Sequence, residues 1–188
     1  MSKKIIAIIG MAGSGKSEVV RIIERKYNLP KVYFGQVVMD ELACQNLEVN
    51  PQNEQKVREE LRAQYGMGVC AIKSLDRITE ALETSDIVIV ESLYSWEEYK
   101  ILREKYQENY LNILIHTSPQ TRFARLQNRK VRPIQKEEIL EKRDYSEIEN
   151  INKGGPIAMA DFVIVNESDL EYLENEIDKV MGEIKNNF

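Results

Sequence analysis

The stretch Gly10-Met11-Ala12-Gly13-Ser14-Gly15-Lys16-Ser17 decides the fold of this chain of 188 residues. It matches the pattern G-x-x-x-x-G-K-[S/T], in which a glycine-rich turn ends in a lysine and a hydroxyl residue. Residues 3–9 before it are largely apolar and β-branched, as a strand buried on both faces of a parallel sheet should be. After it, apolar side chains recur at helical spacing. The local prediction is strand, glycine loop, helix.

The loop predicts a pocket for a polyphosphate. Glycines allow positive φ, so the backbone can close around an anion with several N–H groups and the positive end of the next helix pointing inward. We expect Lys16 to place a mobile charge on the β and γ phosphates and Ser17 to offer its hydroxyl to Mg²⁺. A glycine turn that matches by chance is the alternative, which the flanking strand and helix disfavour. The other phosphate-binding positions are expected to be Gly10, Ala12, Gly13, Ser14 and Gly15.

Length and composition indicate a single globular domain. The chain has 43% apolar and 30% charged residues, typical of a soluble protein, and its net charge of −5 disfavours polymeric nucleic acid as a partner. No stretch reaches the length of a membrane-spanning helix, and the short apolar run near the start lacks the cleavage site of a secretory signal. Cys44 and Cys70 suit buried thiols in a reducing compartment. We therefore expect a cytoplasmic monomer or homodimer that binds small molecules and makes no membrane contact.

Strands and helices alternate along the rest of the chain. Further strands are expected at 32–34, 86–90, 111–115 and 161–165, and helices at about 35–47, 51–65, 69–83 and 95–107, with two more after positions 118 and 168. This alternation predicts an α/β fold with a parallel sheet covered by helices on both faces. Ligands of such sheets bind beyond the carboxyl ends of the strands, and the residues expected at that edge are Gly10, Gly35, Glu91 and His116.

One acid and a group of arginines are candidates for handling phosphate. Glu91 ends a buried strand, where an acid can hold Mg²⁺; a capping or merely exposed carboxylate is the alternative. Residues 122–143 hold eight basic residues against three acids, and Arg125 and Arg129 are spaced to share one face of a helix. With Arg132 and Arg143 they could surround a transferring phosphoryl group, although a solvated basic surface is the usual role of such a run.

Other candidates are weaker. His116 is the single histidine, and a structural role is favoured over that of a general base, because phosphoryl transfer needs little proton chemistry. Tyr94, Trp96 and Tyr99 could line an acceptor pocket, with packing as the alternative.

As a whole, the chain resembles the nucleoside-monophosphate-kinase-like branch of P-loop proteins, above all adenylate-kinase-related and dephospho-CoA-kinase-like proteins. The resemblance rests on GMAGSGKSE, FGQVVMDE, LRAQYGMG, VIVES, HTSPQTRFARLQNR and MADFVIVNES, in that order. It implies a three-layer P-loop NTPase fold in one domain with a five-stranded core at 1–34, 84–127 and 156–188. It further implies a helical acceptor-binding insertion at 35–83 and a mobile, arginine-bearing lid at 128–155. ATP and Mg²⁺ are the implied donor pair.

The resemblance also implies roles for single residues. Arg125 would lie by the adenine or the phosphates, Arg129 would contact phosphate, Arg143 would be a lid arginine, and Asn166 would lie in the turn beside the adenine. Lys16, Arg129 and Arg143 are thus the candidate catalytic residues, and Ser17 and Glu91 the candidate metal ligands. On the acceptor side the candidates are Gly35, Arg62 and Tyr94.

The acceptor half departs from both related activities. Adenylate kinases have an Asp and an acceptor-binding Arg where this chain has Gln36 and Met39, and a second acceptor arginine after the third strand is also missing. Dephospho-CoA kinases carry an Asp near the position of Gln36 that can take the proton of a sugar hydroxyl, and this acid is also absent here. In this half Arg58 and Arg62 remain as the candidate acceptor-binding cations.

The sequence therefore leads to three functional hypotheses. The first is ATP-dependent, Mg²⁺-requiring phosphoryl transfer to a small nucleotide-like acceptor, of the nucleoside monophosphate or dephospho-CoA type. The second is a nucleotide-binding regulatory or switch protein with a degenerate acceptor site, which the residues at 36 and 39 suggest. The third is a slow NTPase.

Overall fold

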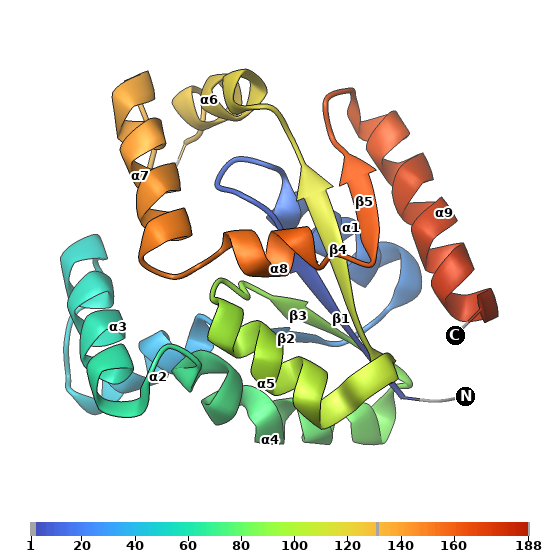
Figure 1. Cartoon of the computed structure of the whole chain (residues 1–188), viewed down its shortest axis with the longest axis horizontal. Coiled ribbons are helices and arrows are strands. Elements are labelled where there is room, and N and C mark those ends of the chain that lie inside the picture. The colour runs from blue at the N-terminus through green and yellow to red at the C-terminus, as the bar shows by residue number, and fades with distance from the viewer. Residues whose placement is uncertain (1–2, 131, 188) are drawn as a thin grey trace.

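The computed structural model describes residues 3–130 and 132–187, so Met1 and Ser2 at the start lie outside it. Its centre is a sheet of five parallel strands in the order β2-β3-β1-β4-β5 (Figure 1). The strands are β1 (Lys4–Ile9), β2 (Lys31–Tyr33), β3 (Ile87–Glu91), β4 (Tyr110–His116) and β5 (Phe162–Val165). The predicted fold class is confirmed.

Helices connect the strands. The first part of the chain holds α1 (Lys16–Tyr27), α2 (Gln36–Cys44), α3 (Pro51–Tyr65), α4 (Val69–Thr84) and α5 (Trp96–Tyr106), with the short 3₁₀ helix η1 (Gln107–Asn109). The second part holds α6 (Pro119–Gln127), α7 (Glu137–Glu149), α8 (Gly154–Ala158) and α9 (Leu170–Asn187). Asn50 caps α3 ahead of Pro51, and its side chain accepts a hydrogen bond from Asn53 N at 2.9 Å.

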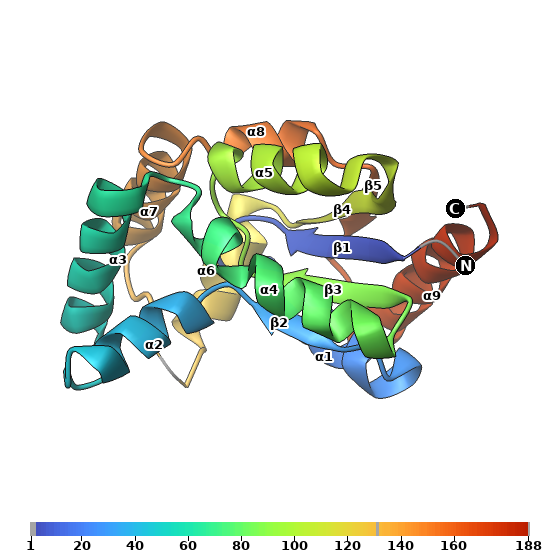
Figure 2. The ribbon, with the colours of Figure 1, turned by 90° about the horizontal axis from the view of Figure 1, so that it is seen from below.

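The central strand β1 divides the core into two layers because its side chains alternate between the faces of the sheet. Ile6 and Ile8 pack with α1 and α9, whereas Ile5, Ala7 and Ile9 pack with α2, α4 and α5. Figure 2 shows the sheet between α5 and α8 on one side and α1 on the other. Each buried isoleucine contributes about 1.5–3 kcal/mol of hydrophobic stabilisation. This double burial fixes the carboxyl end of β1, from which the glycine loop emerges.

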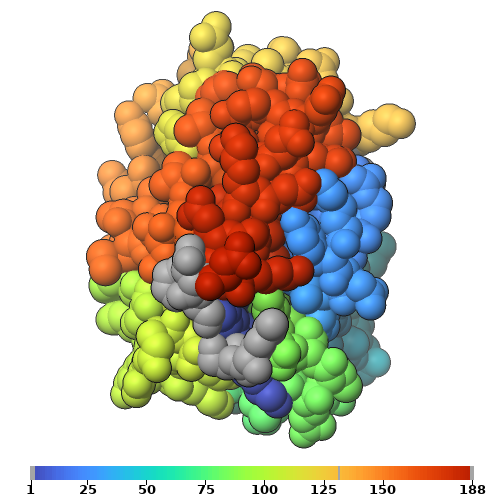
Figure 3. Space-filling model, turned by 90° about the vertical axis from the view of Figure 1, so that its right-hand side faces the viewer, coloured from blue at the N-terminus to red at the C-terminus, as the bar shows by residue number. Residues whose placement is uncertain are grey.

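The last helix closes the second layer. Figure 3 shows α9 running over the surface beside α1. Its apolar stripe, including Leu173 and Ile177, is buried, while Arg25 and Glu174 form an ion pair at 2.5 Å along the rim. An exposed pair of this kind contributes at most about 1 kcal/mol, so the apolar contact holds the helix.

Two expectations about local structure are corrected. Cys70 is a buried thiol as predicted, but Cys44 is exposed at the end of α2. The sequence pattern also predicts neither of the helices α7 and α8. Most of α7 lacks an apolar stripe: among its residues only Leu140 is buried, and Ile139 and Ile148 are exposed.

A third, small apolar cluster joins the segment after β4 to the glycine loop. It consists of Ala12 in the loop, Leu126 in α6, Ile134 in the connection and Leu140 in α7. In Figure 1, α6 and α7 lie above the carboxyl ends of the strands, and α3 lies below α7 at the same end of the molecule. The glycine loop is thus overhung by the segment that the sequence predicts to be a lid; its mobility stays a prediction.

Candidate functional site

The glycine loop closes tightly between β1 and α1. Gly13 and Gly15 have φ values of 81° and 96°, in the left-handed region that favours glycine. A Cβ added at Gly13 would come within 2.9 Å of the Leu126 side chain, and one at Gly15 would collide with the Asn166 amide. These two positions therefore require glycine for both conformation and space.

Lys16 and Ser17 start α1 at the end of the loop. The Lys16 ammonium donates to the Met11 carbonyl at 2.9 Å, and the Ser17 hydroxyl donates to a Glu91 carboxylate oxygen at 3.0 Å. The structure thus brings together the two residues predicted as metal ligands, although they are 74 positions apart in the chain. Burial is the main cause that lowers the pKa of Lys16 to about 7, followed by the positive charge of Lys153.

A layer of polar side chains supports the loop from behind. The Ser14 carbonyl accepts hydrogen bonds from Thr117 Oγ1 at 3.1 Å and from Asn166 Nδ2 at 2.8 Å. Arg125 donates to Asn166 Oδ1 at 3.5 Å, a long contact. Arg125 and Asn166 are therefore neighbours beside the loop. The contacts with adenine or phosphate that the resemblance implies for them stay a prediction. No motif in the sequence indicates the role of Thr117.

Arg122 is a second missed residue. The residue is 4% exposed, and its guanidinium donates to the Ala12 carbonyl in the loop at 3.0 Å. The same group binds Asp144 of α7 through two nitrogens, at 3.1 and 2.6 Å. In the sequence, Arg122 is one of the eight basic residues at 122–143, and no feature of that stretch distinguishes it from the others. Arg122 fastens α7 to the loop.

A third missed residue, Lys153, lies between α7 and α8. It is 2% exposed, its ammonium is 4.6 Å from the centre of the Tyr94 ring, and it pairs with Glu147. Glu147 also accepts from Arg143 Nε at 3.0 Å. Burial opposes ionisation of Glu147, but the Lys153 and Arg143 charges outweigh it and lower its pKa. Arg143 therefore belongs to one charged cluster with Glu147 and Lys153, and all three charges act on Lys16. The role of Arg143 as a lid arginine stays a prediction.

The prediction that Arg125 and Arg129 share one face of a helix is wrong. Helix α6 ends at Gln127, and its cap Asn128 folds its side chain back to the Ala124 carbonyl at 2.9 Å. Arg129 lies beyond this end and is exposed, so the i, i+4 relation does not hold. Arg132 lies farther along and binds Glu54 of α3 through two nitrogens, at 3.2 and 2.6 Å. The Arg132 guanidinium thus contacts α3 rather than the glycine loop.

The predicted acceptor residues lie on three separate elements. Gly35 caps α2 with φ −64°, and a Cβ there would collide with the Tyr33 ring. Tyr94 follows β3 and is mostly buried, with its hydroxyl 3.4 Å from Ser92 Oγ. Arg62 on α3 is half-buried, and its Nε has no hydrogen-bond partner among the described residues. Their joint contact with an acceptor stays a prediction.

The residues present fit a magnesium-bound nucleotide. Ser14 Oγ is buried in the loop without a partner among the residues described, a donor that a phosphate oxygen would satisfy. Nowhere in residues 3–130 and 132–187 do three or more His, Cys, Asp or Glu side chains gather to hold a metal by themselves. Ser17 and Glu91 offer two oxygen ligands, and Mg²⁺ characteristically takes the others from phosphate and water.

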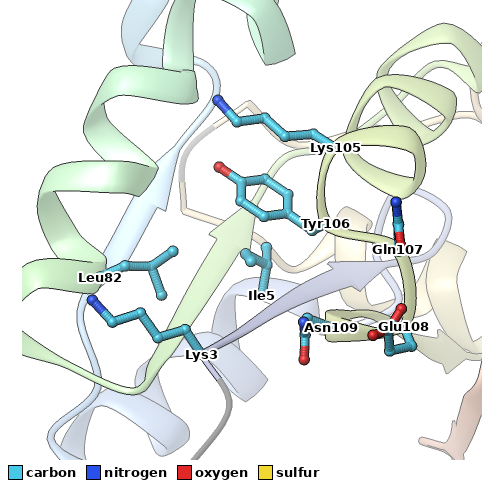
Figure 4. Close-up of a pocket in the computed structure, with 8 residues that line it drawn as sticks. All are labelled: Lys3, Ile5, Leu82, Lys105, Tyr106, Gln107, Glu108 and Asn109. Carbon is cyan, nitrogen blue, oxygen red and sulfur yellow. The ribbon is translucent and has the colours of Figure 1, made fainter.

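Two hollows lie away from the glycine loop. One of about 440 Å³ is lined by residues including Lys3, Leu82 and Tyr106 (Figure 4), near the start of β1 and thus at the opposite end of the sheet from the loop. Another of about 450 Å³ lies between β2 and α4. His116, at the end of β4, is exposed. Neither hollow is lined by residues of the glycine loop, and His116 is not part of the candidate phosphate site.

The loop, the sheet and the overhanging cationic segment define a nucleotide-binding P-loop domain with a kinase-like fold. Two solved kinase structures share this fold. The shikimate kinase of Bacteroides thetaiotaomicron is 13% identical, with a TM-score of 0.61 over 97% of this chain and 98% of that one. A gluconokinase of Sinorhizobium meliloti is 15% identical, with a TM-score of 0.57 over 98% and 94%. At such low identities the likeness shows the fold alone.

Sequence comparison is more specific. The family described as AAA domain matches residues 6–152. The UPF0200 protein of Methanocaldococcus jannaschii is 39% identical over 97% of this chain and 91% of its own length. That of Thermococcus kodakarensis is 34% identical over 96% and 97%. The chain belongs to the AAA domain family and is one of the UPF0200 proteins. Each helix in the described part of the chain is too short or too polar to cross a lipid bilayer.

Proposed function

We propose that this protein is a small-molecule kinase that transfers the terminal phosphoryl group of ATP, in the presence of Mg²⁺, to a nucleotide-like acceptor. The observation that carries the proposal is the position of Lys16, between the glycine loop and a cluster of cations on the segment after β4. Phosphoryl transfer depends mainly on positioning and on cations that balance the charge of the transferring group. A nucleoside monophosphate or dephospho-CoA is the acceptor type that the sequence resemblance supports.

Each part of the site has a role in this proposal. The amides of residues 13–17 and Lys16 hold the phosphates, and Ser17 and Glu91 hold the metal. When bound, Mg²⁺ neutralises phosphate charge. Arg143 reaches the site from α7, where closure of the segment would exclude water as a competing acceptor. Gly35, Arg62 and Tyr94 form the acceptor side.

Lys16→Ala tests the donor half. We expect it to abolish turnover, because no other loop side chain can replace the ammonium at the β and γ phosphates. The assay measures ADP formation from ATP with a panel of nucleoside monophosphates and dephospho-CoA. Lys179→Ala is the control, since Lys179 is an exposed lysine on α9. Transfer by Lys16→Ala at the wild-type rate would refute the role of Lys16.

The acceptor side favours one competing function, a nucleotide-binding switch. Gln36 donates to Asp40 at 2.9 Å along the surface of α2, and Met39 packs against the apolar core. Neither residue supplies the charge that adenylate kinases have at these positions. ATP binding without acceptor-stimulated ADP formation would support the switch, and hydrolysis at the same rate with water alone would support a slow NTPase.

A further inference from the structure

Lys153 places a second buried ammonium group at the phosphate site, outside the glycine-loop motif. Only 2% of the residue is exposed, although lysine is almost never fully buried without a compensating partner. Its ammonium lies over the ring of Tyr94 at 4.6 Å and pairs with the Glu147 carboxylate. A lysine held in this way is a candidate for binding an anion.

The chain fixes Lys153 against the core. Gly155 in α8 packs so closely on α5 that a Cβ there would come 2.6 Å from the Trp96 ring. The Trp96 amide donates to the Ile151 carbonyl at 3.3 Å. Figures 1 and 2 both show α8 lying along α5. Lys153 is therefore next to residues packed on α5, and its amide also donates to the Glu147 carbonyl of α7 at 3.1 Å.

The charges in this cluster do not balance. With both lysines protonated, Lys16, Lys153 and Arg143 are three cations, and Glu147 is the one carboxylate among the described residues that contacts two of them, which leaves an excess of two positive charges. Arg122 does not change the sum because it has its own partner, Asp144. Like charges in a poorly solvated site repel strongly unless an anion lies between them. A phosphate group would supply the missing negative charge.

We propose that Lys153 and Arg143 form a phosphate subsite that Glu147 occupies as an internal anion in the nucleotide-free protein, and that a phosphate group of the bound nucleotide replaces this carboxylate. The inference rests on the proposed function and adds to it a phosphate-binding residue and a competitor built into the chain. Glu147 then lowers the affinity for phosphate, whereas Lys153 raises it. The two members of one ion pair have opposite effects on binding.

This opposition gives a sharp test. Binding of Mg²⁺-ATP and of inorganic tripolyphosphate is measured by calorimetry for the wild-type protein and single variants. Lys153→Gln should weaken both by about tenfold or more, the effect of losing a charged hydrogen bond, and Lys153→Arg should restore most of it. Glu147→Gln should tighten both by about threefold to tenfold, because the competing carboxylate is gone.

Matched controls separate this effect from general electrostatics. Lys142→Gln and Glu149→Gln make the same charge changes at exposed positions of α7. At 0.15 M salt their charges are screened beyond about 8 Å, so both should bind the two probes within about twofold of wild type. Thermal unfolding of every variant establishes that it is folded at the assay temperature.

The outcomes distinguish this inference from the proposed function. A purely structural ion pair would make Glu147→Gln weaken binding as Lys153→Gln does; that result, or an unchanged affinity in Glu147→Gln, overturns the inference but leaves the kinase proposal in place. If Lys153→Gln does not fold, the Glu147→Gln arm decides alone by its sign. Opposite shifts without ADP formation on any acceptor would support the inference and refute the transferase. A wild-type protein that binds neither probe refutes both.

Discussion

At the scale of single residues, the charge state of Lys16 links nucleotide binding to pH. Burial lowers its pKa to about 7 in the free protein, so the ammonium loses its proton as the pH rises above that value. Bound phosphates would raise the pKa back toward its ordinary value, because they favour the charged form. Binding above pH 7 then takes up a proton, and affinity for ATP should fall as pH rises from 7 to 9, by at most about tenfold per pH unit.

Calorimetry in two buffers of different ionisation enthalpy measures this proton uptake directly. Burial also lowers the pKa of Lys153. The Lys153→Arg variant carries a fixed charge at this position because arginine stays protonated, and the fall in affinity should persist in it if Lys16 is the cause. Affinity that is constant from pH 7 to 9, without proton exchange, would contradict the assignment to Lys16.

The residues of this site differ in how well the sequence could reveal them. The glycine loop is a local motif, so Gly13, Gly15 and Lys16 could be predicted together with their chemistry. Arg122 and Lys153 could not, because what distinguishes each is a partner brought by the fold: Asp144 for Arg122, 22 positions along the chain, and the ring of Tyr94 for Lys153.

At the scale of elements, one ion pair joins the segment after α6 to α3. Arg132 binds Glu54 through two nitrogens; the Glu54 side chain is 7% exposed and that of Arg132 is 55% exposed. We expect Arg132→Gln to loosen the 132–149 segment, with faster amide hydrogen exchange there. Because the pair is half exposed, the free energy of unfolding should fall by only about 1 kcal/mol or less. Hydrogen-exchange mass spectrometry and denaturant unfolding measure the two effects.

Glu54→Gln should produce the same local loosening from the other side. Glu60→Gln is the matched control, since Glu60 pairs at 3.8 Å with Lys56 on its own helix and that pair joins no two elements. If Arg132→Gln left exchange in the 132–149 segment at the wild-type rate, the pair would not restrain it.

The elements themselves were predictable in proportion to their burial pattern. Strands β1 and β3 are apolar over nearly their whole length, and α1 has a clear amphipathic repeat, so their positions follow from the sequence. Helix α7 could not be predicted in this way, because it is held by Arg122 and by the small cluster around Leu140 rather than by a continuous apolar face. Such a helix depends on tertiary contacts that no local pattern records.

At the scale of the whole molecule, the site joins parts of the chain that are far apart in sequence. The loop after β1, the end of β3, α6, α7 and the turn after β5 all contribute polar groups to it. A ligand that contacts several of these parts binds the folded state and not the unfolded chain, so it must stabilise the fold by mass action. The stabilisation depends only on ligand concentration relative to the dissociation constant.

Mg²⁺-ATP at a hundred times its dissociation constant should therefore stabilise the protein by about 2.7 kcal/mol, which for a domain of this size raises the melting temperature by roughly 5–10 °C. Differential scanning calorimetry with and without nucleotide measures the shift. Lys16→Ala should show almost none at the same concentration, while the exposed variant Lys179→Ala should match wild type. An equal shift in Lys16→Ala would mean that the nucleotide binds elsewhere, because Lys16 is the one lysine within the loop that we propose holds the phosphates.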